Sequence, residues 1–400
     1  MRSVLLLLSL VLAATHATSC AYAQWDIEES HTTASLRGIH NVGGGVAWAS
    51  GTNGTVLRTE DGGYLWQTCA IPPGAEKLDF RGVQAFDENT AIVMSSGPGD
   101  QSRLYKTTDG CQTWKLVFTN PDKDGFFDGI SLFAPSQDAL GHPLDHSHVT
   151  GYVIGDPVEG AFALFSTRDG GNSWSRRIAT QRGSNGAGCK VDTFAAKSGE
   201  AAFAASNESL LTLNSSFLLF VTGGSDARIG YTDLFSLDGA LCHESAHFKS
   251  LPITHGNPSS GAFAFAVQPG YEARSNFPDK IVVVGGDYKL PGATNDNAVL
   301  VSRVGNLFQT SKKTETPPHR YRSAVAWDAD QKLWITVGPN GTDISTDDGK
   351  NWRPLTPLPT DPADADKNWN ALSLPFVVGP HGRIGRLRTI DQKSLATKKP

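Results

Sequence analysis

The chain consists of short segments in which apolar and polar residues alternate, the two-residue period of a β-strand with one buried face. The segments recur in groups of four, separated by glycine-rich turns. The first group starts at Leu36 and reads LRGIHNV, GVAWASG, GTVLRT and LWQTCAI; further groups start at Phe80, Phe127 and Tyr321. The spacing of apolar residues that is typical of an amphipathic helix does not offer an alternative interpretation of these segments. The sequence therefore predicts an all-β fold of repeated four-stranded units.

One turn pattern marks four of these units. It reads Ser/Thr-x-Asp-x-Gly-x-x-Trp and resembles the Asp-box, or BNR repeat, of β-propellers. The aspartate can accept hydrogen bonds from N–H groups of its own turn, and the glycine supplies a positive φ, so a structural role is favoured over a catalytic or calcium-binding one. The tryptophan then begins the outer strand and offers a large apolar surface. The motif residues are Asp61 with Trp66, Asp109 with Trp114, Asp169 with Trp174, and Asp347 with Trp352.

The spacing of the turns predicts the number of units. Successive turn aspartates lie 48, 60 and 178 residues apart, so the last interval holds two more units without a clear motif. The final unit, which begins at Trp369, lacks its outer strand, and the segment that begins at Trp25 resembles that strand. We therefore predict a seven-bladed β-propeller over residues 24–390, closed by the N-terminal strand, with a tail over residues 391–400.

The N-terminus predicts export. Residues 1–23 have the layout of a signal peptide: a basic residue, an apolar run over positions 4–14, and the sequence AYA before a cleavage point at Gln24. The apolar run is too short for a membrane span, and no later segment is long enough. We predict a periplasmic or secreted protein, without a membrane span, that is a monomer.

Charge and motifs restrict the chemistry. The chain carries a net charge of −5 at pH 7, which disfavours nucleic acid as a partner. Nucleotide-binding, nucleophile-elbow and zinc-protease motifs are absent, so we predict no cofactor and no metal. The stretch GHPLDHSH over residues 141–148 contains possible metal ligands, but a polar surface insertion is the favoured interpretation.

Four cysteines remain after removal of the signal peptide. An even number in an exported chain favours two disulfides. We predict that Cys69 pairs with Cys111 and Cys189 with Cys242, because the members of each pair fall within one blade or in neighbouring blades. The sequence has no Cys-x-x-Cys spacing, which disfavours a redox or zinc role.

Candidate binding residues follow from the position of the innermost strands, which line the central channel of a propeller. Aligned in register, these strands place several charged residues at one channel mouth, and loops that follow the second strands add others. Three arginines would favour an anionic ligand, since guanidinium pairs with carboxylate or phosphate. A salt-bridged mouth without a ligand is the alternative. The candidate ligand-binding or partner-binding residues are Arg37, Arg81, Asp128, Asp156, Glu208, Asp287, Tyr288 and Arg322.

The repeats resemble those of the photosystem II stability and assembly factor family, in particular its non-photosynthetic bacterial branch. The segments GDPVEG, GGDY, YRSAVAW and VGPNGTDISTDDGKNW carry the likeness, which covers nearly all of the mature chain. The resemblance implies an exported seven-bladed propeller that acts as a non-enzymatic scaffold and binds an envelope or secreted protein on a face with arginines. Arg37, Arg81 and Arg322 are the residues that match this face, whereas Asp128 and Glu208 interrupt it.

A glycoside hydrolase is the alternative, because Asp-box propellers also include sialidases. A sialidase uses three arginines, a tyrosine nucleophile assisted by a glutamate, and an aspartate as acid/base. Tyr288, Glu208 and Asp128 supply the catalytic types here, with a glycan or small anionic molecule as ligand. Against this interpretation, the sequence after Leu36 lacks the proline of the sialidase Tyr/Phe-Arg-Ile-Pro motif, and sialidases have six blades.

Overall fold

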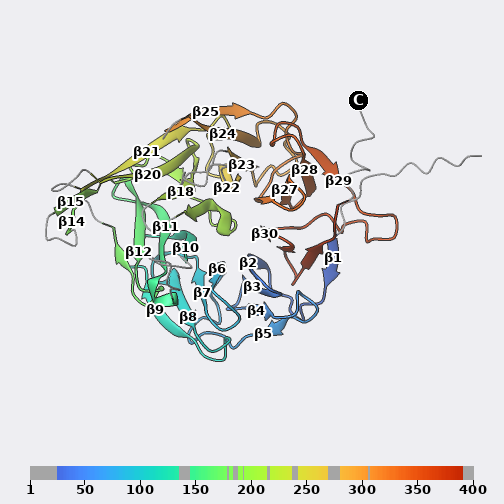
Figure 1. Cartoon of the computed structure of the whole chain (residues 1–400), viewed down its shortest axis with the longest axis horizontal. Helices are drawn as coiled ribbons and strands as arrows, with labels where there is room; N and C mark the ends of the chain where they lie inside the picture. Colours follow the sequence, from blue (N-terminus) through green and yellow to red (C-terminus); the bar gives the residue numbers. More distant parts are fainter. Residues whose placement is uncertain are drawn as a thin grey trace, which may run out of the picture.

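The computed structural model describes residues 25–134, 145–177, 180–182, 188–191, 193–213, 217–236, 242–268, 280–304 and 307–390. Seven β-sheets stand around one axis as the blades of a propeller, which confirms the predicted fold (Figure 1). The described residues contain no helix long and apolar enough to cross a membrane. The predicted signal peptide and C-terminal tail lie outside these residues.

Four blades are simple antiparallel sheets whose strands follow one another from the channel outward. Blade 1 comprises β2 (Leu36–Gly43), β3 (Val46–Gly51), β4 (Val56–Thr59) and β5 (Gln67–Thr68). Blade 2 comprises β6 (Phe80–Ala85), β7 (Ala91–Ser95), β8 (Arg103–Thr107) and β9 (Lys115–Thr119). Blade 3 comprises β10 (Phe127–Phe133), β11 (Thr150–Val158), β12 (Ala161–Thr167) and β13 (Ser175–Arg176). Blade 6 comprises β26 (Ala324–Asp328), β27 (Leu333–Gly338), β28 (Gly341–Ser345) and β29 (Arg353–Leu355).

Blades 4 and 5 are six-stranded sheets, and the sequence did not reveal their extra strands. Blade 4 comprises β17 (Leu210–Thr212), β18 (Leu218–Val221), β20 (Arg228–Ser236) and β21 (Cys242–Ser250), extended outward by β15 (Gly188–Val191) and β14 (Thr180–Arg182). Blade 5 comprises β22 (Ser260–Gln268), β23 (Lys280–Asp287), β24 (Ala298–Val304) and β25 (Leu307–Lys313), extended inward by β19 (Gly223–Gly224) and β16 (Glu200–Ala201). Three short 3₁₀ turns complete the described structure: η1 (Gly99–Gln101), η2 (His146–His148) and η3 (Asn207–Ser209).

Blade 7 joins the two ends of the described chain. Its strands β30 (Ala371–Ser373), β31 (Phe376–Val378) and β32 (Ile384–Leu387) are completed by the N-terminal strand β1 (Trp25–Glu28). Trp25 lies opposite Leu387 and Glu28 opposite Ile384 in an antiparallel register. The predicted closure of the ring by the N-terminal strand is therefore correct.

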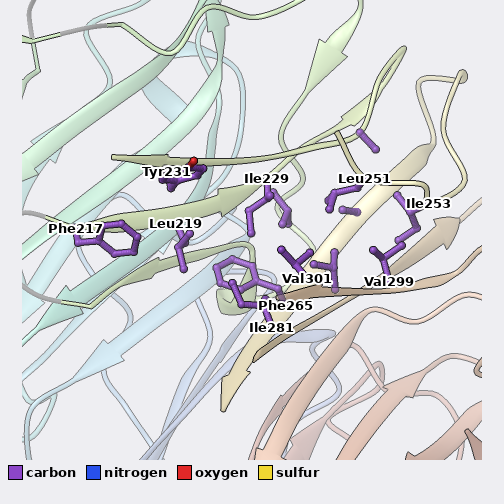
Figure 2. Close-up of a cluster of buried hydrophobic side chains, with 14 residues drawn as sticks. Phe217, Leu219, Ile229, Tyr231, Leu251, Ile253, Phe265, Ile281, Val299 and Val301 are labelled. Carbon is purple, nitrogen blue, oxygen red and sulfur yellow. The ribbon is translucent and has the colours of Figure 1, made fainter. Parts of the chain in front are cut away.

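The hydrophobic core is divided among the seven interfaces between blades. Each interface buries one cluster of side chains drawn from the facing sides of two sheets. Figure 2 shows the cluster between blades 4 and 5, where Leu219 and Ile229 contact Phe265, Ile281 and other residues of the neighbouring sheet. Burial of alternate side chains against both neighbours explains why these segments fold as strands.

The four turn motifs hold themselves together with side-chain hydrogen bonds. In the first, the Thr59 hydroxyl donates to Asp61 Oδ1 at 2.8 Å, and the Leu65 N–H donates to the same oxygen at 3.0 Å. The Gly63 N–H donates to Thr59 Oγ1 at 3.0 Å. The other three turns repeat this arrangement around Asp109, Asp169 and Asp347. The four aspartate carboxylates thus accept hydrogen bonds from groups of their own turns.

The second turn departs from the glycine pattern. Cys111 stands where the other copies have glycine, and it has a positive φ of 64°. It forms a disulfide with Cys69, which follows the outer strand of blade 1. The first predicted disulfide is therefore present, and it joins blades 1 and 2. The side chains of Cys189 and Cys242 are outside what the structure describes, but their strands β15 and β21 pair in parallel, with Lys190 opposite His243.

The segment that precedes the inner strand β17 of blade 4 crosses the channel, and we call residues 200–209 the channel segment. Figure 1 shows its short helical turn inside the ring of blades. The Asn207 side chain accepts from Val83 N–H at 3.1 Å and donates to Ile39 O at 3.4 Å, which ties it to blades 2 and 1. The Ser206 hydroxyl donates to Ser323 O of blade 6 at 3.4 Å. The channel segment therefore fills part of the central channel.

Candidate functional site

A pocket of about 650 Å³ opens at one mouth of the channel, and we call it the mouth pocket. Its lining combines charged and polar side chains from blades 1, 2, 3 and 7 with prolines and aromatic residues, several of which come from blades 5 and 6, and residues 201–205 of the channel segment form the floor. The lining residues used below are Arg37, Arg81, Asp128, Asp156, Phe203, Phe263, Tyr288, Tyr321 and Asn370.

The mouth pocket lies at the opposite end of the inner strands from the turn motifs. Arg37 is near the start of β2, whereas Gly45 lies in the turn that follows this strand. The Gly62 N–H of the first turn motif donates to Gly45 O at 2.9 Å. The same relation holds in blade 2, where the Gly110 N–H donates to Asn89 O at 3.0 Å. The pocket and the turn motifs are thus separated by the length of a blade.

β-Bulges place the pocket side chains. The register between the first two strands shifts between Leu36 and Gly38 in blade 1, between Phe80 and Gly82 in blade 2, and between Phe127 and Gly129 in blade 3. The residues left without a partner at these three bulges are Arg37, Arg81 and Asp128. A bulge changes the direction in which a side chain points, and all three side chains line the pocket. A fourth shift, between Ala262 and Ala264, leaves Phe263 unpaired in blade 5. Alignment of the expected inner strands did not identify Phe263, although Phe263 occupies the bulge position in blade 5 that Arg37, Arg81 and Asp128 occupy in blades 1, 2 and 3.

The two pocket arginines share one carboxylate. Arg81 Nε donates to Asp79 Oδ2 at 2.8 Å, and Arg37 Nε lies 3.9 Å from Asp79 Oδ1. Arg81 Nη1 also donates to Ala204 O of the channel segment at 3.3 Å. Burial lowers the pKa of Arg37, and the Asp79 charge partly opposes this shift. Two guanidiniums against one shared carboxylate leave this side of the pocket suited to an anionic group.

Two carboxyls face the pocket from blade 3. Asp128 is only 2% exposed, and Asp156 lies at a second bulge, between Gly155 and Pro157. Burial raises the pKa of the Asp128 carboxyl well above its ordinary value, the Asp156 charge raises it further, and Arg81 acts in the opposite direction. Burial also raises the pKa of Asp156, which accepts from the Ala202 N–H at 3.2 Å. Both shifts favour uncharged carboxyls.

Aromatic rings form the other side of the pocket. Phe203 of the channel segment stacks on Phe263, with ring centroids 4.1 Å apart. Tyr321 and Tyr288 meet Phe263 edge to face at 5.0 Å and 6.1 Å. Of these four residues the sequence pointed only to Tyr288, because the channel segment and the bulge in blade 5 had no recognisable signal.

The structure places three predicted site residues outside the lining of this pocket. Arg322 is 1% exposed, and its guanidinium is bound to Asp343 inside blade 6. Asp287 is also buried and accepts from the Lys289 N–H at 2.9 Å, as in a turn. Glu208 belongs to η3, and Leu372 of blade 7 lies beside it. Asp128 and Tyr288 therefore share the pocket without Glu208, contrary to the arrangement that a sialidase-like set of the three requires.

The predicted histidine loop provides no metal centre in the described residues, which contain no group of three or more possible ligands. His146 Nδ1 lies 3.6 Å from Asp87 Oδ2, and its ring packs against Phe86. His148 Nδ1 lies 3.0 Å from Asp145 Oδ1. Residues 135–144, which include the first part of this stretch, lie outside the described chain.

Glu208 should make folding stability depend on pH. Burial raises its pKa from 4.5 to about 7, so the folded state binds the proton more tightly than the unfolded state. Stability should therefore fall as the pH rises from about 4.5 to 7 and stay low above that range. We expect Glu208→Gln to raise the free energy of unfolding by about 2 kcal/mol at pH 8.5, allowing for partial exposure, and to change it little at pH 4.5. Urea unfolding at the two pH values measures this, with the exposed Glu76→Gln as control. Equal effects of Glu208→Gln at both pH values would contradict the prediction.

Together, these features define a seven-bladed β-propeller with a pocket at one mouth of its channel, and residues 201–205 of the channel segment form part of the lining of that pocket. A search of family models gave no match, and a search of curated proteins gave none either. A solved structure described as YCF48 bound to D1 peptide matches with a TM-score of 0.50 and 15% identity, covering 91% of this chain and 97% of that one. YCF48 from Cyanidioschyzon merolae gives a TM-score of 0.49 and 16% identity, covering 91% and 98%. At this identity, the first match shows the propeller fold alone.

Proposed function

We propose that this protein is an exported, non-enzymatic binding propeller that holds a segment of an envelope or secreted protein in the mouth pocket. The observation that carries the proposal is the pairing of two guanidiniums with an aromatic wall in one cavity of about 650 Å³. Such a pocket suits a polypeptide segment that presents an acidic group beside a large apolar side chain. The similar structure of YCF48 bound to D1 peptide supports this choice of partner class.

A glycosidase is the second candidate, and one observation favours it. Asp128 and Asp156 are two carboxyls in one pocket beside Tyr288, and a glycosidase needs two carboxyls in different protonation states. Burial raises the pKa of both, which suits a general acid and leaves the base or nucleophile unsupplied. A binding role therefore accounts for more of the pocket.

Charge reversal at the two pocket arginines tests the binding role. We expect Arg37→Glu/Arg81→Glu to weaken partner binding by at least about tenfold, because it replaces attraction for an anionic group by repulsion. A photo-crosslinker at position 288, on the exposed rim, should capture the partner from an extract of exported proteins and identify the bound segment. The crosslink should disappear in the double variant.

The matched control reverses two exposed lysines near the turn motifs, Lys115→Glu/Lys350→Glu, and changes the net charge equally. This control should keep the crosslink. Equal loss in both double variants would point to overall charge and contradict a specific pocket. Hydrolysis of a glycan by the purified protein, abolished in Asp128→Asn, would instead establish the glycosidase.

A further inference from the structure

Asp128 is a buried carboxyl whose hydrogen bonding is incomplete within the described part of the protein. It is 2% exposed and lines the mouth pocket, yet among the described residues its Oδ2 atom has no hydrogen-bond partner. Asp343, which is fully buried, is by contrast bound by the Arg322 guanidinium and by the N–H and ring of His319. A buried polar atom without a partner is costly in a folded protein. The free oxygen of Asp128 therefore marks a contact that a ligand can complete.

The groups around Asp128 explain why this contact depends on its proton. The charge of Asp156 disfavours ionisation of Asp128, because two carboxylates would then lie near each other. The guanidinium of Arg81 has the opposite effect and favours ionised Asp128. Arg81 is also hydrogen-bonded to the Asp79 carboxylate, so its positive charge is divided between Asp79 and Asp128. The adjoining floor of the pocket, residues 201–205, consists of alanines and Phe203 and adds no charge. An anionic ligand group on the arginines would be a further negative charge beside the two carboxyls.

We propose, on the basis that the mouth pocket holds the partner as described above, that it binds the anionic group of that partner together with one proton, which the Asp128–Asp156 carboxyl pair holds. The protonated Asp128 donates its O–H to the ligand, while Arg37 and Arg81 carry the charge of the ligand. As the pH rises the pair ionises, repels the ligand and loses its donor, so binding weakens. The propeller therefore binds its partner more tightly in acidic surroundings.

The test uses the mature protein and two small probes that carry a phenyl ring for the aromatic wall. The first, 3-phenylpropionate, is an anion above about pH 5.5, and the second, 3-phenylpropionamide, is its neutral analogue. Ligand-observed NMR gives the dissociation constant of each between pH 5.5 and 8.5. We expect the constant for the anion to rise at least about tenfold over this range, as binding linked to one proton requires, and that of the amide to stay constant.

Asn at position 128 imitates the uncharged carboxyl and keeps a hydrogen-bond donor. In Asp128→Asn the anion should bind with almost the same affinity at both pH values, and at pH 8.5 at least about tenfold more tightly than to the unaltered protein. Asp156→Asn should flatten the pH dependence in the same direction, so the result does not rest on one variant. Thermal unfolding of each variant shows whether it is folded. Glu208→Gln should keep the full pH dependence, because Glu208 lies outside the pocket lining although it titrates in this range.

The outcomes separate this proposal from the proposed function. One outcome is that the anion binds with the same dissociation constant from pH 5.5 to 8.5 and fails to bind to Arg37→Glu/Arg81→Glu. In that case the mouth pocket keeps its proposed binding role, and proton-linked binding is wrong. If Glu208→Gln removes the pH dependence and Asp128→Asn does not, the Asp128–Asp156 pair is also excluded as its source. If the arginine double variant binds the anion as well as the unaltered protein, or if the unaltered protein does not bind it at pH 5.5, both proposals fail.

Discussion

Replacement of Arg322 by methionine is expected to lower the free energy of unfolding by about 3–5 kcal/mol. Arg322 and Asp343 are buried inside blade 6, and Arg322 Nε donates to Asp343 Oδ2 at 2.9 Å. Without the guanidinium, Asp343 would be a buried carboxylate whose remaining partner is His319, at 2.8 Å. The cost therefore comes mainly from the uncompensated charge. Chemical unfolding of the two proteins measures it.

Two controls show whether the loss arises this way. The double variant Arg322→Met/Asp343→Asn removes both charges and should recover most of the lost stability. Lys313→Met breaks an ion pair with Asp296 in which both side chains are about half exposed, and should cost less than about 1 kcal/mol. If Arg322→Met costs no more than Lys313→Met and instead abolishes partner binding, Arg322 has the ligand-binding role that the sequence predicted.

Loss of the Cys69–Cys111 disulfide is expected to lower the free energy of unfolding by about 3–4 kcal/mol. The bond closes a chain segment with a sequence separation of 42 residues and links neighbouring blades, so it restricts the unfolded chain considerably. The variant Cys69→Ala/Cys111→Ala should show this loss in urea unfolding. Addition of a reductant to the unaltered protein should reproduce it, and unchanged stability in both experiments would contradict the prediction.

The backbone at position 111 offers a second, matched variant. Its φ of 64° is the conformation that glycine adopts in the corresponding turns, at Gly63, Gly171 and Gly349. Cys69→Ala/Cys111→Gly should therefore be about 1 kcal/mol more stable than Cys69→Ala/Cys111→Ala, since alanine is strained at positive φ. Equal stability of the two double variants would show that the turn tolerates a side chain at position 111. The disulfide alone would then explain why cysteine stands at this position.

Much of the fold followed from local sequence patterns. Alternating segments indicated the strands, the turn aspartates indicated the repeats, and Trp25 identified the strand that closes blade 7. Each of these features depends on neighbouring residues or on a regular spacing, so one sequence carries enough information. The channel segment had no such signal, because residues 200–209 have neither strand alternation nor a turn motif.

The candidate site was predicted in part. The second residue of each expected inner strand could be aligned in several blades, and in blades 1, 2 and 3 a bulge aims the side chains of Arg37, Arg81 and Asp128 into the pocket. The same alignment included Arg322, but Asp343 lies on β28 of blade 6 and binds it there. Contacts between neighbouring strands decide which arginine faces the pocket, and the position of an arginine in the sequence does not reveal these contacts.

The sequence by itself determined the strands, the self-contained turns, the number of blades and the end of the propeller at which a site should lie. These follow from side-chain period and local hydrogen bonding. Only the tertiary structure decided that the channel segment closes the floor, that Phe203 and Phe263 form an aromatic wall, and that Asp128 is left with an unpartnered oxygen among the described residues. Those features arise where residues far apart in the chain meet, and their burial and pairing depend on the assembled ring.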